Sequence, residues 1–165
     1  MRPRAAPRAG ATLLAAALVL QASAAGACGY HAVMNDLAAA HPRSIEVALA
    51  VRDALDRGDL QELRALPSAL GYLRATRLLR DFQPQAAALA GRQAQSVAVL
   101  LVESGLWARY RGTDGAASPE LHVAGPSAGD RVVVTSEAVL RALVDGGLAP
   151  EHAARMGVLL VDRQA

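Results

Sequence analysis

Lysine is absent from this sequence of 165 residues, and all 17 of its basic residues are arginine. An arginine-only basic set is typical of a GC-rich coding bias, so it does not by itself indicate recognition by guanidinium groups. The single cysteine, Cys28, excludes an intramolecular disulfide, and an oxidising compartment would therefore add no cross-link to the fold. Aromatic residues make up only 3% of the chain, so the apolar share of 53% consists mainly of alanine and leucine.

Motifs that identify an enzyme are also missing. The sequence has no phosphate-binding glycine loop, no HExxH, no paired-carboxylate motif and no internal repeat. No serine or cysteine nucleophile stands in a motif that would supply an activating base. His122 and His152 fall within predicted secondary structure, where we expect exposed or hydrogen-bonded side chains. We therefore predict a protein that is not an enzyme and that needs no cofactor.

Residues 1–27 have the pattern of a secretory signal peptide. Three arginines within the first eight residues precede an apolar run, Ala11–Leu20, and small residues at Ala25 and Ala27 indicate a cleavage site. The apolar run is too short for a membrane span. Removal of this segment leaves 14 arginines against 15 acidic residues, a formal net charge of −1. The sequence thus predicts a bacterial protein exported to the periplasm or beyond, and it does not favour nucleic acid as a partner.

Cys28 would be the first residue after cleavage at Ala27, the position that is acylated in a bacterial lipoprotein. A lipobox normally carries leucine three residues earlier, where this chain has Ala25. Lipidation of Cys28, with membrane attachment through it alone, stays open beside a plain unpaired thiol. Cys28, His31 and His41 could also bind Cu(I) or Zn(II), although the alternative is two ordinary surface histidines near a terminus.

The segment from 28 to 95 is predicted to be helical. Apolar spacing indicates helices at Ile45–Arg57 and Ser68–Phe82, a short amphipathic segment at Leu60–Leu66, and a short helix or linker from 85 to 95. Three arginines of the second helix are expected on a solvated face, and contact with an anionic lipid or a partner is the alternative; they are Arg74, Arg77 and Arg80.

The segment from 96 to 165 is predicted to supply the sheet. Strands are expected at Ser96–Val102, Leu106–Arg111 and Glu120–Ala124, with a hairpin turn at 103–105. The stretch from Asp130 to Asp162 follows as a strand to Thr135, a helix capped by Ser136, a Gly146-Gly147 stop, a short helix from Pro150, and a strand at Val158–Val161. We predict an α+β fold in which helices cover an antiparallel sheet of four or five strands, as one domain with the preceding helices.

Residues 96–162 resemble the C-terminal half of the sterol-carrier-protein (type two) family of lipid-binding domains, and the match is carried chiefly by the stretch from Asp130 to Asp162. The resemblance is carried mainly by a pattern of apolar and glycine positions, and the matching residues are Asp130, Val132, Thr135, Leu140, Leu143, Gly147, Leu148, Pro150, Ala153, Met156, Gly157 and Leu159. It implies an apolar ligand, a lipid or isoprenoid, in a groove between sheet and helices. The groove would be lined by Trp107, Leu121, Val133, Leu140, Leu143 and Met156.

Three functional hypotheses follow. The first is an exported, non-enzymatic protein that binds an apolar ligand, and the same six side chains would simply be core if no cavity forms. The second is a structural or interaction protein of the envelope, anchored through Cys28 and docking a partner protein through its N-terminal helices. The third is a periplasmic metal binder that uses the N-terminal cysteine and histidines.

Overall fold

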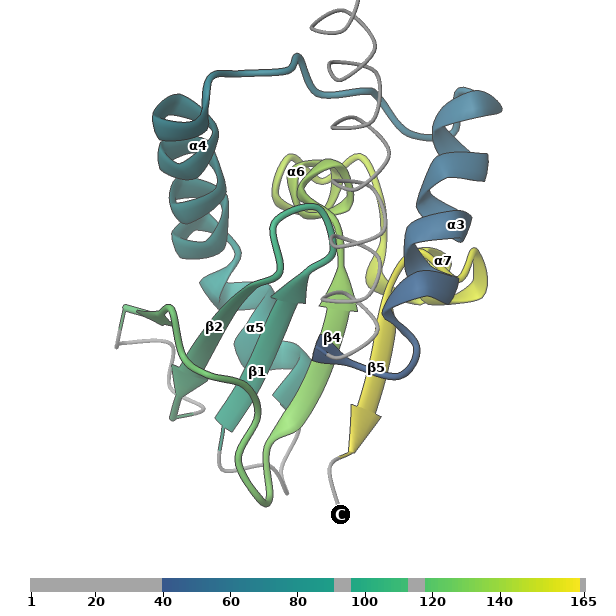
Figure 1. The fold of residues 1–165 in the computed structure, drawn as a ribbon. Coiled ribbons are helices and arrows are strands. Elements are labelled where there is room, and N and C mark those ends of the chain that lie inside the picture. Colours follow the sequence, from purple (N-terminus) through teal and green to yellow (C-terminus); the bar gives the residue numbers. More distant parts are fainter. Residues whose placement is uncertain (1–39, 91–95, 113–117, 164–165) are drawn as a thin grey trace, which may run out of the picture. The chain divides into compact units, whose positions relative to one another are not determined.

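Apolar, β-branched runs form the central strands of the sheet. The computed structural model describes residues 40–90, 96–112 and 118–163. Within these ranges the sheet has five strands in the order β3-β2-β1-β4-β5 (Figure 1), which are β1 (Ser96–Leu101), β2 (Leu106–Arg111), β3 (Glu120–Leu121), β4 (Arg131–Thr135) and β5 (Leu160–Arg163). The helices of the same ranges are α3 (Ser44–Asp56), α4 (Ser68–Asp81), α5 (Gln83–Ala90), α6 (Glu137–Val144) and α7 (Pro150–Arg155). The predicted α+β class is confirmed.

The sheet is mixed, whereas the sequence led us to expect antiparallel strands only. β1 pairs in parallel with β4, and the remaining three pairings are antiparallel. The cause lies in the loop from 122 to 130, which brings the chain from the outer strand β3 back to the end of the sheet where β1 begins (Figure 1). β4 therefore starts beside β1 and runs in the same direction.

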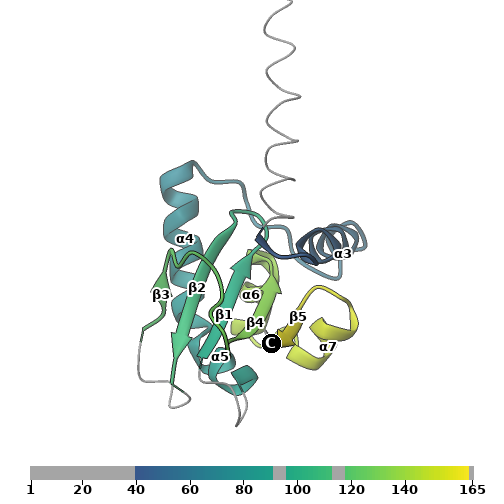
Figure 2. The same ribbon diagram turned by 60° about the horizontal axis from the view of Figure 1, so that its bottom comes forward.

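Helices α4, α5 and α6 cover one face of this sheet. Tyr110 on β2 and Arg131 on β4 are both register partners of Val97 on β1, so these side chains share a face. The Tyr110 hydroxyl donates to the Leu79 carbonyl at 2.6 Å, and the Arg131 guanidinium donates to the Leu89 carbonyl at 2.9 Å. These bonds place the C-terminal ends of α4 and α5 on that face. In both views α5 and α6 lie behind the strands, and α6 packs against α4 (Figures 1 and 2).

The unit from β4 to β5 has the local features that its sequence predicts. The Ser136 hydroxyl oxygen caps α6 by accepting a hydrogen bond from the Val139 amide at 3.1 Å. Gly146 takes a left-handed conformation with φ of 74° just after the helix, and Pro150 opens α7. The last strand begins at Leu160, two residues later than predicted. The amides of Val158 and Leu159 both bond to the Ala153 carbonyl and close α7, so they are not free to join the sheet.

Two predicted elements differ from the structure. Residues 61–67 have no regular secondary structure, so the amphipathic segment predicted at Leu60–Leu66 is not a helix. Three leucines in seven residues without a cap are too few to nucleate one, and the Leu60 amide instead bonds back to the Ala54 carbonyl at the end of α3. The third strand contains only Glu120 and Leu121, because His122 has φ of 59° and turns the chain out of the sheet.

The helices α3 and α4 are those predicted at Ile45–Arg57 and Ser68–Phe82, and α5 lies in the segment where a short helix or linker was expected. The chain divides into two units, Met1–Asp36 and Leu37–Ala165. The second unit contains every helix and strand named above. The proposed signal peptide at residues 1–27 lies outside the described residues. Among the helices that the structure describes, none is long and apolar enough to cross a membrane.

A buried ion pair fixes the returning loop to the sheet. Asp130, only 2% exposed, accepts a hydrogen bond from Arg109 Nε at 3.1 Å and another from the Ser127 amide at 2.7 Å. The Ser96 hydroxyl at the start of β1 donates to the other carboxylate oxygen. Arg109 Nη2 also donates to the Gly125 carbonyl at 2.8 Å. The Asp130 network, meaning these five residues, therefore joins β1, β2 and the loop at the point where β4 begins.

Replacing Asp130 by alanine should lower the free energy of unfolding by about 3 kcal/mol, because it leaves the largely buried Arg109 guanidinium without its counter-charge. A matched control is Asp56→Ala, which removes the exposed pair with Arg52 and should cost about 0.5 kcal/mol or less. Urea unfolding followed by far-ultraviolet circular dichroism measures both. Equal effects of the two substitutions would show that the Asp130 network does not secure the loop.

Candidate functional site

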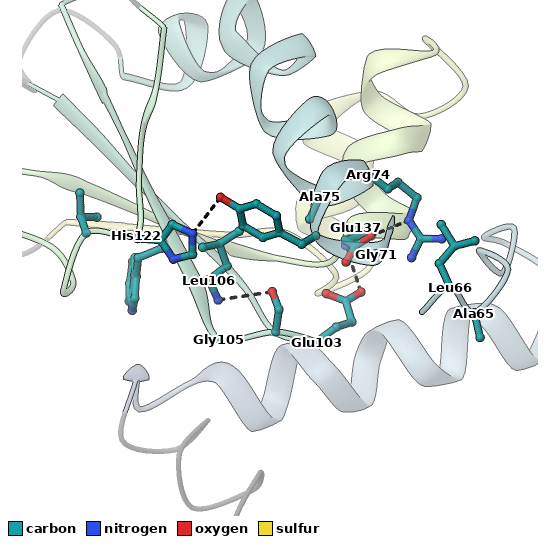
Figure 3. Close-up of a pocket in the computed structure, with 14 residues that line it drawn as sticks. Ala65, Leu66, Gly71, Arg74, Ala75, Glu103, Gly105, Leu106, His122 and Glu137 are labelled. Carbon is teal, nitrogen blue, oxygen red and sulfur yellow. Dashed lines mark hydrogen bonds and ion pairs between the residues drawn. The ribbon is translucent and has the colours of Figure 1, made fainter. Parts of the chain in front are cut away.

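A cleft of about 630 Å³ lies between the N-terminal half of α4 and the turn that joins β1 to β2 (Figure 3). Its walls come from segments that are far apart in the sequence. They are Ala65 and Leu66 before α4, Gly71, Tyr72, Arg74 and Ala75 on α4, Glu103, Ser104 and Gly105 in the turn, Leu106 and Trp107 on β2, His122 and Val123 after β3, and Glu137 on α6. Apolar side chains thus share this cleft with a small number of polar groups.

One side of the cleft carries an acid–arginine group, defined here as Arg74, Glu103 and Glu137. Arg74 Nε lies 2.8 Å from Glu137 Oε2, and the two side chains are only 22% and 10% exposed. The Glu137 backbone amide donates to Glu103 Oε1 at 3.0 Å, while Arg74 Nη1 donates to the Arg64 carbonyl at 2.6 Å. The group therefore links α4, α6 and the β1–β2 turn. Because Glu137 is the first residue of α6, its amide has no partner within the helix, and Glu103 supplies one.

The Glu103 carboxyl is a weaker acid than an ordinary glutamate side chain. Desolvation raises its pKa from 4.5 to about 7, and the nearby Glu137 carboxylate adds to the increase. The hydrogen bond from the Glu137 amide and the charge of Arg74 act in the opposite direction. Glu103 as a whole residue is exposed to solvent, while the many protein atoms around its carboxyl cause the desolvation. A carboxyl of this kind is a candidate functional group.

An aromatic pair carries the other side of the cleft. The rings of Tyr72 and His122 stack with centroids 5.3 Å apart and an angle of 25° between their planes. The Tyr72 hydroxyl lies 2.9 Å from His122 Nε2, within hydrogen-bond distance. Figure 3 shows this histidine on the side of the cleft opposite the acid–arginine group. The positive φ of His122 turns the chain out of β3 at the residue whose side chain makes this contact.

Two of the six predicted groove residues, Trp107 and Met156, line surface cavities, although not the same one. Trp107 lines the cleft and is 5% exposed. Leu121 is half-buried and packs against the core. Met156 is half-buried and lines a separate cavity of about 450 Å³ beside α7, together with His152.

The other three predicted groove residues are part of the hydrophobic core. Val133 and Leu140 are 0% exposed, and Leu143 is 4% exposed. None of them lines the cleft. They support it indirectly, since Leu140 and Leu143 anchor α6, the helix that begins with Glu137.

The residues proposed for metal binding are only partly described. Cys28, the candidate for lipidation, and His31 lie outside the described residues. His41 is half-buried; desolvation is the main cause that lowers its pKa, and the charge of Asp162 opposes that effect. Within residues 40–90, 96–112 and 118–163, no group of three histidine, cysteine, aspartate or glutamate residues could hold a metal ion.

Several polar residues of the cleft were not singled out as site residues by the sequence. Glu103 lies in the hairpin turn predicted at 103–105, Glu137 in the helix predicted after Ser136, and Arg74 among the three arginines expected on a solvated face. Arg77 and Arg80 are exposed as expected, whereas Arg74 is turned inward to Glu137. The sequence offers one signal for Glu103 as a site residue. It is a charged residue between two strongly apolar strands, at the point where the first of them ends and the chain comes near solvent.

No protein-family model matches the chain, and no curated protein sequence is similar enough to it to count as a match.

Replacing Glu103 by glutamine should flatten the dependence of stability on pH between about 4.5 and 7. Because the pKa of Glu103 is raised in the folded protein, its contribution is fully present below pH 4.5 and is lost as the pH rises through 7. Urea midpoints at pH 4.5 and pH 8, measured for the wild type and for Glu103→Gln, test this. Glu151→Gln, at an exposed position, is the control. If all three proteins change equally with pH, the carboxyl of Glu103 is not perturbed.

Proposed function

We propose that this chain is an exported, non-enzymatic protein that binds an apolar ligand, such as a lipid or isoprenoid, in the cleft between α4 and the β1–β2 turn. The observation that carries the proposal is the cleft itself. Its volume of about 630 Å³ falls in the range of about 300–1,000 Å³ that is usual for small-molecule sites. Its mixture of apolar walls and a few polar groups also fits that class of site.

The apolar walls supply the affinity in this proposal. Leu66, Leu106, Trp107 and Val123 line the cleft together with two alanines. Covering an alkyl chain with such groups gains about 0.8 kcal/mol for each buried methylene. Leu66 is 37% exposed and stands at the margin of the cleft, so an apolar ligand would also cover a leucine that now contacts water.

The resemblance to the sterol-carrier family supports the same proposal in one respect. It implies the order strand, helix, glycine turn, short helix and strand, and the chain has β4, α6, α7 and β5 in that order at those positions. α6 then contributes Glu137 to the cleft. Membership of the family remains a prediction from the sequence.

A second candidate function has an observation of its own. An exposed face of α4 carries Leu70 and Leu73, one helical turn apart, which are 52% and 59% exposed. Such a group of apolar side chains on one helix face is typical of a contact surface. An envelope interaction protein, anchored through Cys28 or free, would use this face to dock a protein partner.

Native mass spectrometry of the protein purified from its own envelope separates these functions. We expect a chain that starts at Cys28 or close to it and that retains an adduct of lipid size. The same spectrum reports any acyl mass on Cys28 and any bound metal. A chain without a ligand, found as a dimer or with a second protein, would contradict the carrier proposal and favour the interaction protein.

Replacing Gly71 by leucine should abolish retention of the adduct, because the new side chain enters the cleft from the wall of α4. A Cβ at Gly71 would meet only the Leu66 carbonyl oxygen, at 3.7 Å, so the backbone has room for it. Gly71→Ala is the matched control, since both substitutions remove a helical glycine and should raise stability by up to about 1 kcal/mol. Both variants should fold, and only alanine should keep the ligand. Equal adducts on the two variants would place the ligand elsewhere.

A further inference from the structure

We propose that the ligand of the cleft is an amphiphile whose polar end is a protonated amine, held by the Glu103 carboxylate while its alkyl chain covers the apolar wall. This inference rests on the function proposed above, and it adds the chemistry of the head group. It assigns Glu103 a role in binding that goes beyond its contact with α6.

The charges of the cleft favour a cation. Its lining contains two carboxylates, Glu103 and Glu137, and a single guanidinium, that of Arg74. Arg74 and Glu137 form an ion pair at 2.8 Å, whereas Glu103 forms no ion pair with any described residue and feels the charge of Arg74 only at longer range. A ligand with a positive head group would balance it, and the interaction would be strengthened by the limited hydration of this carboxyl.

The geometry of Glu103 leaves an acceptor for such a ligand. Oε1 accepts the Glu137 amide at 3.0 Å, which fixes the carboxylate at the margin of the cleft. The Glu103 backbone amide also bonds to the carboxylate. A carboxylate has about four acceptor positions, so these two bonds leave acceptor capacity for a ligand, and an ammonium group carries only donors. Figure 3 shows the carboxylate turned toward the Glu137 backbone, on the side of the cleft away from His122.

The other polar groups are poorly arranged for an anionic head group such as a carboxylate or phosphate. The guanidinium of Arg74 is already used by Glu137 on one side and by the Arg64 carbonyl on the other. The His122 ring nitrogen that faces α4 is occupied by the Tyr72 hydroxyl. The aromatic side chains of Tyr72 and Trp107 line the same cleft, and aromatic faces attract cations.

The charged and titratable groups around Glu103 set the pH dependence of this interaction. Glu137 from α6 and Arg74 from α4 are its charged neighbours, and Tyr72 and His122 lie across the cleft. Because Glu103 titrates near pH 7, the affinity for an amine should increase as the pH rises from 5 to 8 and then level off. A neutral ligand with the same chain should show no such increase.

Three alkyl probes that differ only in the head group test the inference, namely decylamine, decanol and decanoate. Binding is followed through the fluorescence of the purified protein, because Trp107 is its single tryptophan and lines the cleft. Isothermal titration calorimetry provides an independent signal. At pH 8 we expect decylamine to bind on the order of tenfold more tightly than decanol, the range for a charge-assisted hydrogen bond, and decanoate to bind most weakly.

Glu103→Gln is the decisive variant, since it keeps the size of the side chain and an oxygen that accepts the Glu137 amide. It should remove the tenfold preference for decylamine and leave the binding of decanol unchanged. If decanol binds and decylamine binds no more tightly, or if the preference survives in Glu103→Gln, the amine inference is overturned while the apolar-ligand function stands. If no probe changes the fluorescence or releases heat, both are overturned.

Discussion

The contact between Asp130 and Arg109 determines how the rest of the sheet can be assembled. An aspartate that is 2% exposed has to be paired, and here its partners come from the first residue of β1, from β2 and from the loop that precedes β4. With the loop fixed in this way, β4 can lie beside β1 and run parallel to it. The position of β4 fixes the start of α6, and α6 in turn provides one wall of the cleft. The cleft thus depends on an ion pair at the opposite end of the central strands.

Polar contacts also join the segments that form the cleft, as the Asp130 network joins the strands. Arg74 and Glu137 join two helices, Glu103 joins the second of these helices to a β-turn, and Tyr72 with His122 joins the first helix to the end of β3. Each of these contacts is a hydrogen bond or an ion pair between segments that are distant in the sequence. Polar contacts therefore fix the outline of the cleft, and apolar residues between them form its surface.

The sequence predicts the local structure well and the distant pairings poorly. The Ser136 cap, the glycine stop at Gly146 and the proline at the start of α7 were all identified from neighbouring residues, because capping and turn formation are local effects. The parallel pairing of β1 with β4 was missed, since nothing within either strand specifies the direction of its neighbour. The groove was predicted from the family resemblance and from the apolar face expected of the sheet, and neither separates core residues such as Val133 and Leu140 from lining residues such as Trp107. Arg74 and Glu103 were missed as site residues because their roles arise only when α4 and the β1–β2 turn come together.

The parallel pairing in the middle of the sheet has a consequence for the way in which the chain folds. β1 can form its hairpin with β2 early, because the two strands are joined by a short turn. The other edge of β1 cannot pair with β4 until β3 and the loop from 122 to 130 have formed. Pairing Val97 with Arg131 closes a long loop of intervening chain, which costs conformational entropy. Contacts of such separation slow folding. β1 is also the most apolar strand of the sheet, so its unpaired edge is the surface most exposed to association with other chains before folding is complete.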